Sequence, residues 1–126
     1  MKQIWIVDDD EEMTKAIRMM LELLDCQATG FLNARSAAQA LLAGQRPDLM
    51  LLDINMPEVT GLDLLEFLRR RPEWKELPIV MLSSEAADVT VDKALEMGAD
   101  GYVMKPVTIE EIEKAIAAAF QKRQKG

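Results

Sequence analysis

Residues 49–57 read LMLLDINMP, a run of four apolar residues that leads directly into an aspartate, Asp53. An uninterrupted apolar run of this length is typical of a strand that is buried on both faces of a parallel sheet. The segment therefore predicts a central strand with Asp53 at its carboxyl end.

Similar short apolar runs alternate with helical patterns on both sides of this segment. Strands are predicted over residues 4–7, 28–31, 49–52, 79–82 and 101–104. Helices with apolar residues at spacings of three and four are predicted over residues 13–24, 34–43, 62–70, 86–97 and 109–122. This alternation indicates an α/β fold: a doubly wound, five-stranded parallel sheet of flavodoxin-like order 2-1-3-4-5, with helices on both faces.

Composition and charge limit the classes of function. The 126 residues suit one domain, so residues 1–126 are expected to form a single domain with no output domain. The formal net charge of −7 disfavours direct binding to nucleic acid. The chain contains no histidine, which excludes Ser-His and Cys-His catalysis and any phosphohistidine within it. Cys26 is the single cysteine and is expected to be a buried structural thiol.

The sequence shows no signal-peptide pattern at its start and no apolar run near the ~18 residues of a membrane span. We therefore expect a cytoplasmic protein with no membrane association.

Polar side chains follow four of the predicted strands. Asp8, Asp9 and Asp10 follow the first, Asp53 the third, Ser83 the fourth and Lys105 the fifth. The carboxyl ends of parallel strands share one edge of the sheet, where ligands bind in doubly wound folds. Crowded carboxylates repel one another, and Mg²⁺ relieves that repulsion. The cluster therefore predicts a phosphoryl-transfer site with an aspartate nucleophile, although Asp10 alone could simply cap the next helix.

Four motifs at these strand ends resemble the receiver domain of two-component response regulators, over residues 2 to about 122. They are VDDD at 7–10, LLDINMPEVTG at 51–61, PIVMLSSEA at 78–86 and GADGYVMKP at 98–106. The resemblance implies that Asp53 is the phosphoacceptor. It also implies a Mg²⁺ site, with Mn²⁺ as an alternative ion, formed by Asp8, Asp9, Asp53 and the backbone carbonyl of Asn55.

The same resemblance implies further roles for side chains around the acceptor. Ser83 would be the switch hydroxyl, Tyr102 the switch aromatic and Lys105 the residue that contacts the phosphoryl group. Asn55 and Glu85 would tune the lifetime of the phosphoryl group, and their polarity predicts self-dephosphorylation that is not exceptionally slow. The peptide bond from Lys105 to Pro106 is expected to be cis.

The implied partners are proteins. A sensor histidine kinase or phosphotransfer protein would donate the phosphoryl group. The surface formed by the fourth helix, fifth strand and fifth helix would then control a downstream effector or output domain. Met19 points away from the predicted core, so it is a candidate for kinase docking. We expect a monomer, or a dimer on phosphorylation.

Two other functions remain open at this stage. A receiver-like adaptor could act without phosphorylation, but loss of Asp53 or Lys105 would be its hallmark, and both are present. A phosphatase that forms an aspartyl-phosphate would need a second aspartate where Asn55 stands. We therefore expect no enzymatic activity beyond the chain's own phosphorylation and dephosphorylation.

Overall fold

The computed structural model describes residues 1–84 and 88–124. Its strands are β1 (Lys2–Val7), β2 (Cys26–Phe31), β3 (Leu49–Asp53), β4 (Ile79–Ser83) and β5 (Gly101–Met104). Its helices are α1 (Glu11–Leu23), α2 (Ala34–Leu42), α3 (Gly61–Arg69), α4 (Asp88–Glu96) and α5 (Ile109–Gln124).

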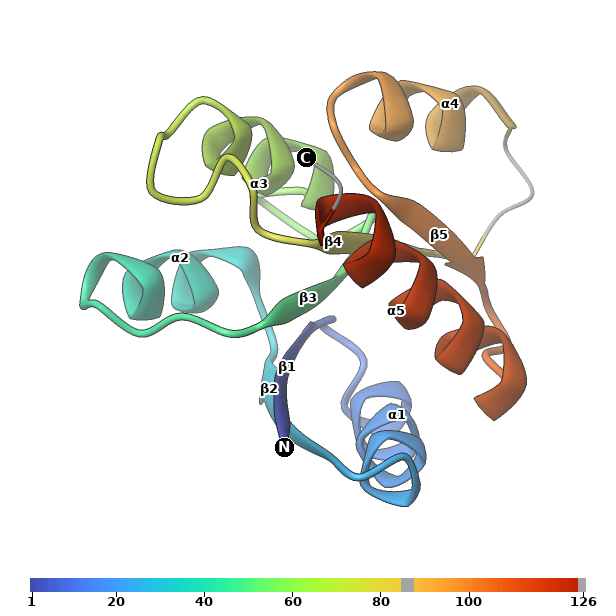
Figure 1. Cartoon of the computed structure of the whole chain (residues 1–126). Coiled ribbons are helices and arrows are strands. Elements are labelled where there is room, and N and C mark those ends of the chain that lie inside the picture. The colour runs from blue at the N-terminus through green and yellow to red at the C-terminus, as the bar shows by residue number, and fades with distance from the viewer. Residues whose placement is uncertain (85–87, 125–126) are drawn as a thin grey trace.

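All strand pairs are parallel, and the sheet order is β2-β1-β3-β4-β5. This is the predicted flavodoxin-like order. Figure 1 shows α1 and α5 on one face of the sheet and α2, α3 and α4 on the other. The order places the carboxyl ends of β1 and β3 side by side, because these two strands are hydrogen-bonded neighbours.

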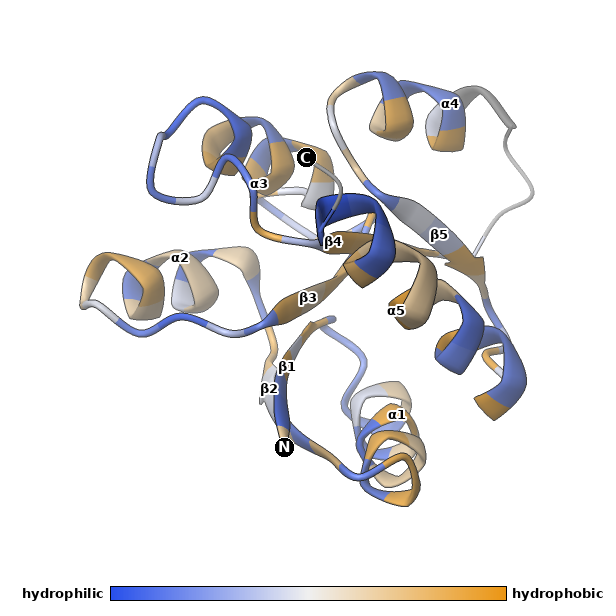
Figure 2. Cartoon of the chain, viewed as in Figure 1, coloured by the Kyte–Doolittle hydropathy of each residue, from blue (hydrophilic) through white to orange (hydrophobic). Residues whose placement is uncertain are grey.

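Each face of the sheet has its own hydrophobic core, and Figure 2 shows hydrophobic residues along the central strands β3 and β4. Successive residues of a strand point to opposite faces. Ile4 and Ile6 of β1 therefore pack against Ile17 of α1, whereas Trp5 and Val7 join the core under α2 and α3. β3 and β4 are fully buried, which explains why their sequences are apolar without alternation.

The element boundaries differ from the predicted ones by a few residues. β2 begins two residues earlier than predicted, at Cys26, because it pairs with β1 along the whole length of both strands. The thiol of Cys26 is only partly buried, so the expectation of a buried thiol was wrong. Among the described residues, no helix is long and apolar enough to cross a lipid bilayer.

Buried charges lie at the opposite end of the sheet from the predicted site. The Asp100 carboxylate is fully buried and accepts hydrogen bonds from the Ile79 N–H at 2.9 Å, the Arg123 Nε at 2.9 Å and an Arg69 nitrogen at 3.2 Å. The Arg69 guanidinium links α3 to the loop before β5, through the Gly98 carbonyl and Asp100, and Asp100 in turn binds Arg123 near the C-terminal end of α5.

Asp100→Asn is expected to lower the free energy of unfolding by roughly 3–5 kcal/mol, because it leaves the buried Arg69 without its anionic partner. Asp92→Asn, an exposed change of the same kind on α4, should change it by less than about 0.5 kcal/mol. Urea denaturation of both variants measures the difference. Equal stabilities would show that the buried network contributes nothing.

Candidate functional site: an acidic cluster at the carboxyl end of the sheet

Three carboxylates meet where β1 and β3 end. Asp8, Asp9 and Asp53 each place a carboxylate oxygen within 4.8 Å of the others. Asp8 and Asp53 are buried, and Asp9 is exposed. The structure therefore brings together the three side chains that the strand-end argument assigned to one site.

The β1–α1 loop is held by its own hydrogen bonds. The Asp10 N–H donates to the Asp8 carboxylate at 3.0 Å, and the Asp10 side chain accepts from the Met13 N–H at 3.1 Å. Asp10 is thus the N-cap of α1. Of the three consecutive aspartates, Asp8 and Asp9 are the ones that belong to the cluster. The buried hydroxyl of Thr14 donates to the Asp10 carbonyl at 3.0 Å and fixes the first turn of α1 against this loop.

The acceptor loop is fixed by a close backbone approach. The N–H of Gly61, the first residue of α3, donates to the Ile54 carbonyl at 3.0 Å. A Cβ atom at Gly61 would lie 1.9 Å from the carbonyl oxygen of Asp53, so this position requires glycine. Gly61 closes the acceptor motif at residues 51–61, but its role was not predicted from the sequence.

Lys105, the residue that follows β5, joins the cluster. Its ammonium lies 2.8 Å from Oδ2 of Asp8 and 3.5 Å from Oδ1 of Asp53. The Lys105 N–H donates to the Ser83 carbonyl at 2.8 Å, which ties the ends of β4 and β5 together. The Ser83 side chain is buried, and the Lys105–Pro106 bond is cis, as expected.

The pKa values of the site reflect this crowding. Burial, the largest influence, and the Asp8 carboxylate raise the pKa of Asp53 from 3.8 to about 6, against the opposing effects of Lys105 and of the Asn55 N–H. Burial by itself lowers the pKa of Lys105, but the hydrogen bond to Asp8 and the Asp53 charge outweigh it, so its pKa is raised. Lys105 thus stays cationic and partly neutralises the cluster.

The donor set fits a hard divalent cation. Oδ2 of Asp8 is buried and accepts no hydrogen bond of good geometry within the described part of the chain, although the Lys105 ammonium lies close to it. Mg²⁺ binds through a few carboxylate oxygens and keeps several waters, which suits a cluster with one exposed side, at Asp9. The carboxylates of Asp8, Asp9 and Asp53 could hold such an ion.

Two of the three remaining predicted residues, Asn55 and Tyr102, lie in the described part of the chain. Asn55 follows the acceptor by two residues, and its backbone N–H donates to the Asp53 carboxylate. Tyr102 lies on β5 with 47% of its surface exposed, so its ring faces solvent in this conformation. Glu85 lies outside the described residues.

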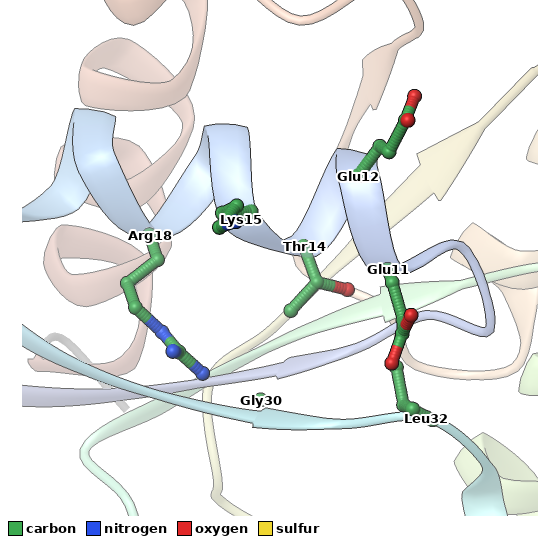
Figure 3. Close-up of a pocket in the computed structure, with 7 residues that line it drawn as sticks. All are labelled: Glu11, Glu12, Thr14, Lys15, Arg18, Gly30 and Leu32. Carbon is green, nitrogen blue, oxygen red and sulfur yellow. The ribbon is translucent and has the colours of Figure 1, made fainter.

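A hollow lies between α1 and β2. Figure 3 shows Arg18 reaching from α1 toward Gly30, where any Cβ would come within 2.6 Å of Thr14. Both acidic and basic side chains line this hollow. Because it lacks the acidic concentration of the cluster beside β1, we assign it no part in phosphoryl chemistry.

The comparisons with known proteins agree with this geometry. A family model described as "Response regulator receiver domain" matches residues 4–117. The chain belongs to this family. The receiver domain is 32% identical to the chemotaxis protein CheY of Pseudomonas aeruginosa, over 95% of the chain and 97% of that protein.

Other relatives are longer proteins. The receiver domain is 36% identical to the transcriptional regulatory protein CpxR of Klebsiella pneumoniae, over 97% of the chain but only 50% of that protein. It thus spans about half the length of such relatives. Among solved structures, a CheY-like response regulator receiver domain from Methanospirillum hungatei superposes with a TM-score of 0.87 at 26% identity, covering 99% of this chain and 98% of that one.

Asp53→Asn is expected to stabilise the metal-free receiver domain at neutral pH. The pKa of Asp53 is about 6 in the folded chain and about 3.8 in the unfolded chain, so the folded state binds the proton more tightly. Stability is therefore lost as the pH rises from about 4 to about 6, and the loss persists above that range. We expect the variant to be more stable by about 1–3 kcal/mol at pH 7.5 and by almost nothing at pH 4.

Urea denaturation in the presence of a chelator measures this difference. Added Mg²⁺ should stabilise the wild type and leave the asparagine variant almost unchanged. A variant less stable than the wild type at pH 7.5 would contradict the inference that the buried, ionised Asp53 carboxylate destabilises the metal-free fold.

Proposed function

We propose that this receiver domain, residues 1–126, is a phosphorylation-dependent switch of a two-component system, with Asp53 as its phosphoacceptor. The observation that carries the proposal is the grouping of Asp53 with a second buried carboxylate, Asp8, and with the Lys105 ammonium, which lies close to both. A sensor histidine kinase or phosphotransfer protein is the proposed donor. The domain acts as a signalling module, and the only chemistry proposed for it is its own phosphorylation and dephosphorylation.

In the proposed reaction, a carboxylate oxygen of Asp53 attacks the phosphorus of the donor's phosphohistidine. The P–N bond breaks, a P–O bond forms, and the imidazole leaves with the electron pair. Bound Mg²⁺ would supply charge neutralisation for the phosphoryl oxygens, held by Asp8, Asp9, Asp53 and the Asn55 carbonyl. Asn55, with Glu85, would then tune the hydrolysis of the product.

The roles of Lys105 and Ser83 follow from their positions. The Lys105 ammonium, 3.5 Å from Asp53, is placed to neutralise a phosphoryl group on that residue. The Ser83 hydroxyl at the end of β4 would donate to another phosphoryl oxygen. Tyr102, now exposed on the neighbouring strand, would turn inward and change the α4–β5–α5 surface that an effector reads.

Phosphotransfer to Asp53 is directly measurable. With a phosphohistidine donor or acetyl phosphate and Mg²⁺, we expect one acid-stable, base-labile phosphoryl group per chain, located at Asp53. Asp53→Asn should abolish the label at this site, and a chelator should abolish it in the wild type. Exposed Asp48→Asn is the matched control and should label normally.

Unchanged labelling of the Asp53→Asn variant would overturn the assignment. A chain that takes up no label but still binds its effector would favour the alternative, an adaptor that works without phosphorylation.

The outer face of α1 suits the donor protein. Met19 is 63% exposed, as the helical pattern predicted, and Leu23, one turn further on, is 76% exposed. These two apolar side chains lie in the C-terminal half of α1, whose N-terminal end adjoins the acidic cluster, so a helix that presents a phosphohistidine to Asp53 could pack along α1 and contact them. Met19 was predicted from the sequence to face away from the core, whereas no such prediction was made for Leu23.

Met19→Asp is expected to lower kcat/KM for phosphotransfer from the cognate kinase about tenfold, because it places a charge in an apolar contact. Phosphorylation by acetyl phosphate needs no protein contact and should be unaffected. Leu42→Asp, at a side chain 59% exposed on α2, is the control for an equivalent change elsewhere. An unchanged rate from the kinase would remove α1 from the docking surface.

A further inference from the structure

Asp9 is the exposed member of the acidic cluster. Asp8 and Asp53 are buried, and the Asp8 carboxylate also accepts a hydrogen bond from the Asp10 N–H at 3.0 Å. The Asp9 side chain has no such burial, so its direction depends on the backbone that carries it. The position of the Asp9 carboxylate in the cluster therefore depends on how firmly residues 8–10 are held.

The Thr14 hydroxyl contacts the backbone on both sides of Asp9. It donates to the Asp10 carbonyl at 3.0 Å and lies 3.4 Å from the Asp8 carbonyl oxygen, so its proton is shared between two acceptors. A threonine in a helix can donate to the carbonyl four residues before it, which accounts for the contact with Asp10. The longer contact with Asp8 reaches six residues back, beyond the helix, and joins α1 to the residue that follows β1.

The methyl group of Thr14 fixes the direction of this hydroxyl. Figure 3 shows the methyl pointing from α1 toward Gly30 of β2, while the hydroxyl points toward the N-terminal end of α1. A Cβ atom at position 30 would lie 2.6 Å from the methyl, so the methyl occupies space that only glycine leaves open. Because Thr14 is buried and β-branched, the rotamer that places its methyl beside Gly30 is also the one that directs its hydroxyl to the loop.

We propose that Thr14 is a positioning residue for the metal site, which holds the backbone on both sides of Asp9 and thereby keeps this exposed carboxylate within the cluster. The inference rests on the proposed function, in which Asp8, Asp9 and Asp53 hold Mg²⁺. Mg²⁺ requires nearly octahedral geometry and tolerates little displacement of a ligand. Groups that orient metal ligands without touching the ion affect its affinity. Loss of the Thr14 hydroxyl should therefore weaken Mg²⁺ binding, although every ligand is retained.

Thr14→Val and Thr14→Ser separate the hydroxyl from the methyl. Valine keeps the shape of the side chain and loses the hydroxyl, whereas serine keeps the hydroxyl and loses the methyl that sets its direction. We expect the valine variant to bind Mg²⁺ about three- to tenfold more weakly than the wild type, which is less than the ~10–100-fold typical of groups bonded directly to a metal ligand. The serine variant should lie between the two. NMR chemical-shift titration of the unphosphorylated, metal-free chain with MgCl₂ measures these affinities.

Amide hydrogen exchange tests the same role in the absence of any ion. The Asp10 N–H donates to the Asp8 carboxylate, so it is protected only while the loop keeps its conformation. In the metal-free Thr14→Val variant, this amide should exchange at least about threefold faster than in the wild type. The amide of Leu21, a buried residue further along the same helix, should exchange at an unchanged rate.

Ile17→Val is the matched control for a general weakening of α1. Ile17 is fully buried one turn after Thr14, and the change removes a methylene group from its packing without touching the loop. This control should melt at a lower temperature than the wild type and bind Mg²⁺ with unchanged affinity. Thermal melting also checks that both Thr14 variants are folded.

Three results would overturn the inference. The first is a valine variant that binds Mg²⁺ as tightly as the wild type. The second is a serine variant that binds more weakly than the valine variant, which would assign the effect to packing of the methyl. The third is an equal loss of affinity in Ile17→Val.

Labelling of Asp53 separates this inference from the proposed function. The valine variant should still label at Asp53 when Mg²⁺ is saturating, because the hydroxyl acts only on the affinity for the ion. A wild type that binds Mg²⁺ but takes up no label contradicts the proposed function alone, and a wild type that binds no Mg²⁺ contradicts both.

Discussion

The site depends on negative charge that is held in a buried place. Asp8 and Asp53 lie below the surface at the ends of adjacent strands, and their carboxylate oxygens are within 4.8 Å of each other. Two buried carboxylates are costly unless a cation compensates them. Lys105 supplies part of that compensation, and its charge cannot neutralise both aspartates together with Asp9. The arrangement therefore favours whatever brings further positive charge, such as a divalent cation, to this edge.

The rest of the fold keeps these charges in place. Buried strands fix the backbone on both sides of the cluster, and the contact between Gly61 and the Asp53 backbone leaves no room for α3 to shift toward it. A second buried charge network, around Asp100, holds the other end of β4 and β5. The strands between the two ends are apolar and paired by backbone hydrogen bonds, so the two charged clusters are separated by the hydrophobic cores.

The exposed apolar surfaces are separate from the cluster. The exposed apolar side chains Met19 and Leu23 lie in the C-terminal half of α1, whereas a groove beside α5 lies along the edge strand β5. Tyr102 lies on that same edge strand at the groove, and Lys105 directly follows the strand at the cluster. A change in charge at Asp53 thus has a short covalent and hydrogen-bonded route, through Ser83 and Lys105, to the groove.

The sequence by itself determined the order of elements, the sheet topology and the strand ends that carry Asp8, Asp53 and Lys105. Periodicity and strand-end position are local properties that a sequence displays directly. Only the tertiary structure revealed the need for glycine at position 61 and the burial of Arg69 against Asp100. Both depend on distances between segments far apart in the chain, and a sequence pattern contains no such distances. The exposure of Leu23 also follows from the tertiary structure, because the packing of the other elements leaves this side chain uncovered.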